Sequence, residues 1–547
     1  MAERIPMVDY LVLDDGEPHL VAHECTNCGA RFFDRRNACA GCFGTEFALA
    51  PVATEGTVRT FTIVTFAAPG VPVPFVASVV DCDGTQVRAN LVNVEPDPDH
   101  VHDGMKVRLS TYSLGADSNG TEAIGFGFEP VACLPHHRTR QGDAMSASDE
   151  IWIVGIRMTK FGKHADKDTV DLAAEAALAA LADAGLSMSD IGVLAAGNLM
   201  NASAGIGQQL QKQIGQTGIP VYNVANACAT GATALRTAIM AVKAGEVRYG
   251  MAVGVEKLSG AGLLGAGGRK KDDSGVWEPS GRYGAVAPID GRIGTEAMPG
   301  VFAQIGTEYG HKCGGTSFEL FAKISEKNHA HSTLNPLAAY QKRFTLEQIM
   351  NDVMIAYPNT RAMCSANCDG AAAAIVCNGE TLKSLSVEQR RRAVKVSASV
   401  LTTDPYEEGC QVLPNVNTLT RNAAATAYEQ AGIGPKDLDL VELHDCFATA
   451  ELVHYDNLML CEEGGAADFF NSGATWRDGA TPVNVSGGLQ SKGHPIAATG
   501  IANIWEICHH LRGEAGDRQI DNAKVGLAHV IGLGSACGVH ILEKSAA

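Results

Sequence analysis

Short runs of alternating apolar and polar residues fill the chain from residue 56 to about residue 130. They read VRTFTIVTF, PFVASVVDC, TQVRANLVNV, MKVRLSTY and AIGFGF, with Gly, Pro and Asp turns between them. Alternation with a period of two predicts strands that have one buried face, and regular spacing of such strands is typical of a small antiparallel barrel. We therefore predict an OB-fold, a β-barrel, over residues 51–133.

The pattern changes near residue 151, where apolar strands begin to alternate with amphipathic helices. The strand IWIVGIRM and the helix VDLAAEAALAALADA open this part, and a similar order starts again at residue 394 with VKVSASVLTT. Nearly continuous apolar strands are typical of parallel sheets that are covered by helices. The sequence predicts a layered α/β fold of two similar βα halves, residues 151–392 and 393–547, with a loop insertion at about 259–350.

Each half contains a strand that leads directly into a helix, at Cys228 in the first half and at His444 to Phe447 in the second. Helix N-termini at sheet ends are where α/β folds place ligands, so we expect the two corners to meet. A helix N-terminus also favours the thiolate form of a cysteine. Cys228 is therefore a candidate nucleophile, and the alternative is a small buried apolar residue.

Composition and charge narrow the classes of function. The chain has 547 residues, of which 46% are hydrophobic and 19% charged, as expected for a globular protein of several domains. A net charge of −18 argues against binding to nucleic acid or to an anionic membrane. The sequence shows no signal peptide and no apolar run that would span a bilayer, so we expect a cytoplasmic protein whose 16 cysteines are mostly reduced.

Four cysteines form two CxxC pairs near the N-terminus. These are Cys25, Cys28, Cys39 and Cys42, and ten residues separate the pairs. Two such pairs place four thiolates around one zinc ion and leave no open coordination position. We predict a rubredoxin-like structural zinc ribbon within residues 1–50, with one zinc per chain; a redox dithiol and four unrelated thiols are the alternatives.

Motifs in both parts of the chain resemble known families. Residues 15–133, with GTVRTFTIVTF, VPFVASVVD and NLVNVEP, resemble the zinc-ribbon/OB-fold partner proteins of certain thiolases. Over residues 150–545, NACATGATAL resembles the nucleophile motif of thiolases, and VSGGLQSKGHPIAATG resembles their GHP motif. The segment ELHDCF resembles the version found in thiolases of the sterol carrier protein type. The polar residues 134–150 are then a linker in a fusion of the two partners.

The resemblance implies a role for each motif residue. Cys228 accepts the acyl group, His494 activates its thiol, and His444 helps to hold the thioester oxygen. Cys446 takes the place of the second catalytic cysteine as acid and base. Gly532 supplies a backbone N–H to a second oxyanion hole, together with Cys228.

The C-terminal segment VIGLGSACGVHIL supports the assignment of Cys446. Aligned with the glycine-rich segment of common thiolases, it puts Val530, not Cys537, at the position of their second catalytic cysteine. Cys537 then falls within the last strand, and we expect it to belong to the core. Asp445 is expected to orient its loop rather than to titrate during catalysis.

Basic residues in the insertion are candidates for contacts with coenzyme A. Arg269, Lys270 and Lys271 are placed to meet its phosphates, and the alternative is a solvated charge run. Ser491, in the turn before His494, is a further candidate contact, and the aromatic residues Trp277 and Tyr283 are candidates for contact with the acyl group.

The resemblance implies a thiolase that cleaves a 3-oxoacyl-CoA with free coenzyme A. We expect a degradative enzyme for a bulky acyl group, whether aromatic as in benzoylsuccinyl-CoA, branched or steroidal. The alternatives are an acetoacetyl-CoA thiolase and a thiolase-fold retro-aldolase acting on a 3-hydroxyacyl-CoA; a non-catalytic CoA-binding scaffold is disfavoured by the complete set of motifs. The expected partners are coenzyme A, acyl-CoA and a second copy of the chain, in a homodimer or a dimer of dimers.

Overall fold

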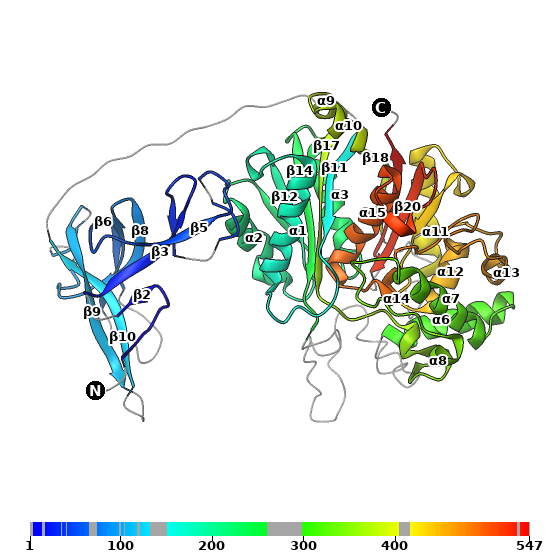
Figure 1. Cartoon of the computed structure of the whole chain (residues 1–547), viewed down its shortest axis with the longest axis horizontal. Helices are drawn as coiled ribbons and strands as arrows, with labels where there is room; N and C mark the ends of the chain where they lie inside the picture. The colour runs from blue at the N-terminus through cyan, green and yellow to red at the C-terminus, as the bar shows by residue number, and fades with distance from the viewer. Residues whose placement is uncertain are drawn as a thin grey trace. The chain divides into compact units, whose positions relative to one another are not determined.

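The chain divides into two compact units, Met1–Asp143 and Ala144–Ala547, in the computed structural model (Figure 1). The structure describes residues 4–545 except for 14–16, 34–35, 40, 65–73, 98–99, 103, 117–120, 132–149, 260–297, 404–415 and 533–535. The predicted linker therefore lies almost wholly outside the described residues. Among the helices that are described, none is both long enough and apolar enough to cross a membrane.

The first unit begins with the ribbon, a small sheet built around β3 (His19–Cys25). Strand β3 pairs with three short strands, β2 (Leu11–Val12), β4 (Arg31–Phe32) and β5 (Phe47–Pro51). Cys25 is the last residue of β3, so this sheet fixes the first of the four predicted zinc ligands.

The barrel that follows has five strands: β6 (Glu55–Val64), β7 (Phe75–Cys82), β8 (Thr85–Leu91), β9 (Lys106–Ala116) and β10 (Glu122–Pro130). They pair in the order β10-β8-β7-β6-β9, and pairing of β9 with β10 closes the barrel. Alternate residues of β7 are buried, and its inward valines pack with Ile124 and Phe128 of β10. The predicted OB-fold barrel is confirmed, and β1 (Arg4–Pro6) adds a strand beside β10.

The second unit is built on a nine-stranded sheet with the order β13-β12-β14-β17-β11-β18-β21-β20-β19. The elements of the first half are β11 (Ile151–Met158), α1 (Thr169–Ala184), β12 (Val193–Gly197), α2 (Ile206–Ile214), β13 (Val221–Val224), α3 (Thr230–Lys243), β14 (Tyr249–Glu256) and β17 (Gly370–Asn378). Those of the second half are β18 (Val394–Thr402), α11 (Val416–Ala431), β19 (Leu440–Glu442), α12 (Ala448–Asn457), α15 (Ile496–Arg512), β20 (Val525–Gly532) and β21 (Ala536–Lys544). The halves join where β11 pairs with β18, and the predicted fold of two βα halves is confirmed.

The strand pairings show which segments of the two halves correspond. Strand β12 lies parallel to β13 and β14, and β19 lies parallel to β20 and forms one further parallel bridge, from Val441 to Val483. Val483 is thus the counterpart of β13, and the turn before α15 is the counterpart of the Cys228 turn before α3. Our interpretation of His444 to Phe447 as the matching corner is wrong, because that corner follows β19, the counterpart of β12.

Helix α3 of the first half packs directly against helix α15 of the second half. A Cβ atom on Gly231 would lie 2.6 Å from the carbonyl oxygen of Ala497, and one on Gly500 would lie 2.6 Å from the backbone nitrogen of Ala232. These contacts leave no space for a side chain, so glycine is required at both positions. The close approach brings the turns before the two helices together.

The insertion predicted as a loop at about 259–350 is partly helical. Residues 260–297 lie outside the described residues, but α6 (Met298–Cys313), α7 (Phe318–Ser332) and α8 (Leu346–Met350) follow them. The side chain of Ser317 caps α7, and Phe321 and Ile324 pack in one core with residues of α12. Burial of this apolar face stabilises the helix. The remaining short elements are β15 (Met354–Ala356), β16 (Asn359–Thr360), α9 (Gly379–Lys383), α10 (Val387–Arg392), α13 (Ala466–Asn471) and α14 (Gly488–Ser491).

Candidate active site

Cys228 lies in the turn between β13 and α3, two residues before the helix begins at Thr230. The Thr230 hydroxyl donates a 2.5 Å hydrogen bond to the carbonyl oxygen of Ala227 and accepts one of 2.8 Å from the backbone N–H of Asn226. Ala227 adopts a φ of 46°, an uncommon conformation for a residue with a side chain. The turn therefore holds the thiol in a fixed place, with Cys228 only 3% exposed.

His494 faces the Cys228 thiol from the turn before α15. Its Nε2 lies 3.3 Å from the Cys228 Sγ, and its Nδ1 lies 2.7 Å from the Thr499 hydroxyl. Burial, and secondarily the Lys492 ammonium, lowers the pKa of His494 to about 3. The imidazole is therefore neutral near pH 7, which is the form that accepts a proton from a thiol.

His444 completes a cluster with these two residues. One ligand atom from each of Cys228, His444 and His494 lies within 4.8 Å of the others, and the two imidazole rings meet edge to face with centroids 5.2 Å apart. The backbone N–H of His444 donates to Nδ1 of His529 at 3.4 Å. Burial, followed by the neighbouring histidines, holds the pKa of His444 well below its usual value, so the ring acts as a neutral hydrogen-bonding group.

Cys446 is the second cysteine of this region and is also buried, with 5% of its surface exposed. Its carbonyl oxygen accepts a 2.8 Å hydrogen bond from the backbone N–H of Ser365. Burial, and next the charge of a Cys228 thiolate, raises the pKa of Cys446 well above its usual value. Cys446 is therefore a protonated thiol at neutral pH, with Cys228 among its electrostatic neighbours.

The Asp445 side chain forms hydrogen bonds with neighbouring chain segments. Its carboxylate accepts hydrogen bonds from the backbone N–H of Leu489 at 2.7 Å, from Asn328 Nδ2 at 3.0 Å and from Gln490 Nε2 at 3.2 Å. Leu489 and Gln490 belong to α14, which leads into the His494 turn. These hydrogen bonds join the loop of His444 and Cys446 to the segment before His494, and the expected role of Asp445 in orienting that loop stays a prediction.

A network of buried polar side chains packs against the loop of His444 and Cys446 through Asp445. The sequence analysis did not predict this network. Asn328 Nδ2 also donates to Glu451 at 2.5 Å, and Glu451 accepts from Tyr455 at 2.6 Å and pairs with Lys327. The side chains of Lys327 and Glu451 are fully buried. The available signal was the position of charged residues between the apolar residues of α7, a pattern that indicates either solvent exposure or a buried ion pair.

Gly532, at the end of β20, lies directly against the nucleophile turn. A Cβ atom at this position would lie 2.5 Å from the carbonyl oxygen of Asn226 and 3.1 Å from the backbone nitrogen of Ala229. Val530 packs against Ala229 in a small buried cluster. Cys537, in contrast, is a fully buried core residue of β21 that lies opposite Ile531, as expected from the alignment of this segment.

The predicted contacts with coenzyme A stay predictions. Ser491 is fully buried, and its hydroxyl lies 2.6 Å from the Ser332 hydroxyl and 3.0 Å from Nδ1 of His329. Arg269 and Lys270 lie outside the described residues, as do the other insertion candidates Lys271, Trp277 and Tyr283.

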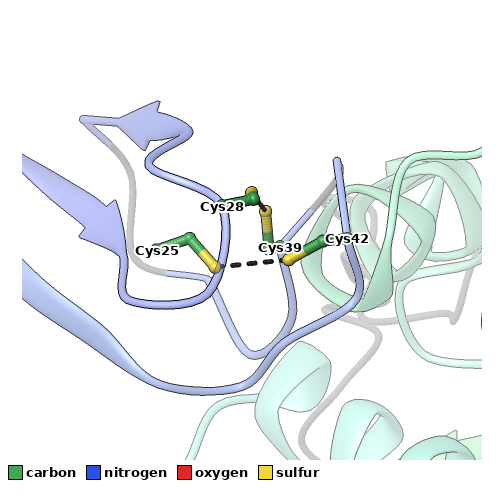
Figure 2. Close-up of side chains that lie close together, drawn as sticks. All are labelled: Cys25, Cys28, Cys39 and Cys42. Atoms are coloured by element: carbon green, nitrogen blue, oxygen red, sulfur yellow. Dashed lines mark hydrogen bonds between the residues drawn. The ribbon is translucent and has the colours of Figure 1, made fainter.

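The four ribbon cysteines converge as the sequence predicted (Figure 2). The Sγ atoms of Cys25 and Cys42 are 3.5 Å apart, as are those of Cys28 and Cys39, and all four lie within 4.8 Å of one another. Sulfurs that bind one zinc ion at about 2.3 Å in a tetrahedron are about 3.8 Å apart, so the donor set fits zinc. The backbone N–H of Gly41 donates to the Cys39 sulfur at 3.3 Å, which stabilises a thiolate there.

Models of known domain families match four segments of the chain. Residues 16–48 match the ChsH2 rubredoxin-like zinc ribbon domain, and residues 50–111 match the ChsH2 C-terminal OB-fold domain. Residues 151–272 match the thiolase N-terminal domain, and residues 412–544 match the thiolase C-terminal domain-like family.

Two solved structures show the same fold as the second unit. The Ltp2-ChsH2(DUF35) aldolase superposes with a TM-score of 0.59 at 22% identity, covering 73% of this chain and 99% of that one. Human mitochondrial 3-ketoacyl-CoA thiolase in complex with CoA superposes with a TM-score of 0.54 at 16% identity, covering 73% and 98%.

Whole-protein relatives agree with these matches. Sterol carrier protein 2 from Homo sapiens is 37% identical over 72% of this chain and 72% of its own length. Acetyl-CoA acetyltransferase from Methanothermobacter thermautotrophicus is 34% identical over 72% of this chain and 100% of its length. Benzoylsuccinyl-CoA thiolase subunit BbsB from Thauera aromatica is 31% identical over 71% and 96%. The chain belongs to the thiolase family of acyltransferases and carries ChsH2-type zinc ribbon and OB-fold domains ahead of its thiolase part.

Proposed function

We propose that this enzyme cleaves a 3-oxoacyl-CoA with free coenzyme A, through an acyl group bound to Cys228. The observation that carries the proposal is the 3.3 Å contact between the Cys228 Sγ and Nε2 of a buried, neutral His494. A nucleophile within hydrogen-bond reach of its base, with that base oriented by a third group, is the arrangement that acyl transfer requires. Thr499 is the orienting group here.

The first half-reaction moves the acyl group to the enzyme. His494 takes the thiol proton, and the Cys228 thiolate attacks the C3 carbonyl carbon of the substrate. The backbone N–H groups of Cys228 and Gly532 stabilise the negative oxygen that develops, and the contact of Gly532 with the nucleophile turn supports this role. The C2–C3 bond then breaks, which leaves the acyl group on sulfur and the electron pair on C2.

Cys446 and His444 act on the leaving fragment. His444 donates a hydrogen bond to the thioester oxygen of the enolate, and the Cys446 thiol gives its proton to C2. Acetyl-CoA departs, or another acyl-CoA where C2 of the substrate carries a substituent. The raised pKa of Cys446 supports this assignment, because a group that delivers a proton must be protonated beforehand. The Cys446 thiolate then removes the proton from an incoming coenzyme A thiol. That sulfur attacks the acyl group, and the Cys228 thiolate leaves and recovers its proton from His494.

We favour a bulky acyl group and degradative cleavage. The likeness to the benzoylsuccinyl-CoA thiolase subunit supports this choice, and the likeness to an acetyl-CoA acetyltransferase supports acetoacetyl-CoA as the alternative. A retro-aldolase acting on a 3-hydroxyacyl-CoA is a second candidate. It is favoured by the similar fold of the Ltp2-ChsH2 aldolase, but it would not use the paired Cys228 and His494.

The test is a panel of CoA esters followed by mass spectrometry of the products. Purified protein is incubated with coenzyme A and 3-oxoacyl-CoA esters, from acetoacetyl to aromatic and steroidal. Cys228→Ala should abolish cleavage, and Cys446→Ala should lower turnover by about 100-fold or more. Cys313→Ala, at an exposed thiol at the end of α6, is the matched control and should keep normal turnover.

The outcomes separate the candidates. Cleavage that depends on Cys228, with an acyl adduct on its peptide, supports the thiolase, and the preferred ester identifies the acyl class. Cleavage of 3-hydroxyacyl esters without an adduct would replace it with the retro-aldolase. Substantially normal turnover of folded Cys446→Ala would remove Cys446 from the mechanism.

Three further properties belong to the same proposal. We infer one zinc ion per chain in the ribbon, because the four thiolates complete its coordination. We infer coenzyme A contacts at Arg269, Lys270 and Ser491, and assembly as a homodimer or a dimer of dimers. Metal analysis, coenzyme A affinity of the single variants and light scattering test these three statements separately.

A further inference from the structure

The catalytic cluster has the composition of a metal site as well as that of an acyl-transfer site. Cys228, His444 and His494 each offer one ligand atom, these atoms lie within 4.8 Å of one another, and all three residues are buried. Thiolate and neutral imidazole are the ligands that zinc prefers. Around a tetrahedral zinc ion a sulfur and a nitrogen ligand are about 3.6 Å apart, close to the 3.3 Å between Cys228 Sγ and His494 Nε2.

The two imidazoles are prepared for a metal ion. Thr499 engages Nδ1 of His494 and so directs Nε2 towards Cys228, which is the kind of outer contact that orients metal-binding histidines. Nδ1 of His444 has no hydrogen-bond partner within the described part of the chain, so no bond at that atom opposes a small rotation of the ring.

We propose that Cys228, His444 and His494 bind one zinc ion, or a similar soft divalent ion, and that the bound ion blocks acyl transfer. The Cys228 thiol releases one proton to solvent on binding, and the sulfur then forms a bond to the metal in place of a bond to the acyl carbon. His494 loses its role as base at the same time, because the same Nε2 binds the ion. Metal binding and acylation of Cys228 are thus mutually exclusive.

This site differs from the ribbon in the number of ligands that the protein supplies to the metal ion. The ribbon provides four thiolates and closes the coordination sphere, whereas the catalytic cluster provides three ligands and leaves a fourth position for water. The catalytic cluster should therefore bind zinc more weakly than the ribbon does and exchange it more readily. Zinc in excess of the ribbon then acts as a reversible inhibitor.

Cobalt(II) is the probe for the proposed site, because cobalt bound to a thiolate gives a charge-transfer absorption. The full chain, with its ribbon already saturated with zinc, is titrated with cobalt(II). We expect one further equivalent per chain with a thiolate-to-cobalt band. Cys228→Ser should remove that band, and Cys313→Ala should keep it.

Alkylation of Cys228 provides a readout that does not require turnover. With zinc bound, labelling of the Cys228 peptide by iodoacetamide should slow at least tenfold, and dilution into a weak chelator should restore it. His444→Asn and His494→Asn should each remove most of the protection. The absence of a further cobalt equivalent, or protection that persists in both histidine variants, would overturn the proposal.

The proposal and the proposed reaction fail in different ways. If zinc protects Cys228 but no CoA ester is cleaved, the metal site is supported and the proposed thiolase reaction is contradicted. If zinc does not inhibit cleavage, and Cys228 is alkylated equally fast with and without zinc, the reaction is supported and the metal site is contradicted.

Discussion

The Asp445 carboxylate accepts a 2.7 Å hydrogen bond from the backbone N–H of Leu489 and thereby joins two segments of the candidate active site. His444 and Cys446 flank Asp445 in sequence, and Leu489 lies five residues before His494. This hydrogen bond therefore helps to set the separation of the proposed oxyanion donor, acid and base. The two segments are 44 residues apart in sequence at this contact, so no local turn geometry fixes their distance.

Replacement of Asp445 by Asn should lower turnover while the fold persists. Both oxygens of the Asp445 carboxylate accept hydrogen bonds from N–H donors. The amide nitrogen of asparagine is itself a donor, so at least one of these N–H groups would lose its acceptor. A buried donor without a partner costs about 1–3 kcal/mol, and the loop relaxes to avoid that cost. We expect kcat to fall about 10- to 100-fold with an unchanged circular dichroism spectrum. Asp478→Asn, at an exposed carboxylate, is the control, and normal turnover of Asp445→Asn would exclude the positioning role.

Buried histidines should make the thiolase unit sensitive to mild acid. Burial lowers the pKa of His454 to about 3, and its two ring nitrogens have no hydrogen-bond partner among the residues described. In the unfolded chain a histidine titrates near 6.5, so between about pH 6.5 and pH 3 the unfolded state binds more protons than the folded state. Stability contributed by the neutral ring is therefore complete above about pH 6.5 and falls as the pH decreases, by about 1.4 kcal/mol per pH unit for each such histidine.

The variant His454→Leu tests the contribution of one buried histidine to this pH dependence. It should reduce the slope of unfolding free energy against pH by about one proton between pH 6.5 and pH 5, as measured by urea denaturation. Stability at pH 7.5 should be retained or increased, because no intramolecular hydrogen bond of the ring is lost. His311→Leu, at an exposed position of α6, should leave the slope unchanged. Equal slopes for His454→Leu and the parent protein would contradict this account.

The fold followed from the sequence wherever hydrophobic periodicity was strong. The two βα halves, the β-barrel and the ribbon are all present in the structure. The helices of the insertion were missed because the Gly-rich and charged residues ahead of them dominated the interpretation. Ser317 as a helix cap, with Phe318, Phe321 and Ile324 at helical spacing behind it, would have predicted α7.

The cysteine and histidines that meet in the candidate site could be predicted, but the polar groups packed around them could not. Cys228 and His494 belong to motifs with a local signature. The contact of Asn328 with Glu451 joins residues 123 positions apart, and a buried polar residue adds nothing to the apolar periodicity. The match between the Cys228 corner and the corner at His444 to Phe447 was also wrong. In the second half a single bridge at Val483 stands where the first half has the strand β13, so the sequence there shows no strand-like alternation.

Asp183→Asn should destabilise the thiolase unit, because Asp183 ties the halves together. Its buried carboxylate pairs with Arg157 at 2.7 Å, Arg392 at 2.8 Å and Arg512 at 2.9 Å. Burial opposes ionisation, but Arg512 and Arg392 outweigh it and lower the pKa of Asp183. Loss of one partner from a buried ion cluster costs about 3–5 kcal/mol, which urea denaturation would detect. Glu380→Gln, in an exposed pair with Lys383, should cost at most about 1 kcal/mol; a similar small effect of Asp183→Asn would refute the prediction.

Cys39→Ser should release zinc and unfold the ribbon. Cys39 is fully buried, its sulfur lies 3.5 Å from that of Cys28, and serine oxygen is a poor substitute for a thiolate ligand of zinc. The ribbon strands are short, so metal binding supplies much of their folding free energy. We expect the zinc content to fall by one ion per chain, and limited proteolysis to cut within residues 20–50. Cys82→Ala removes a buried thiol of the barrel that lies outside the cluster, and it should retain zinc. A full zinc complement in Cys39→Ser would mean that the four cysteines do not share one ion.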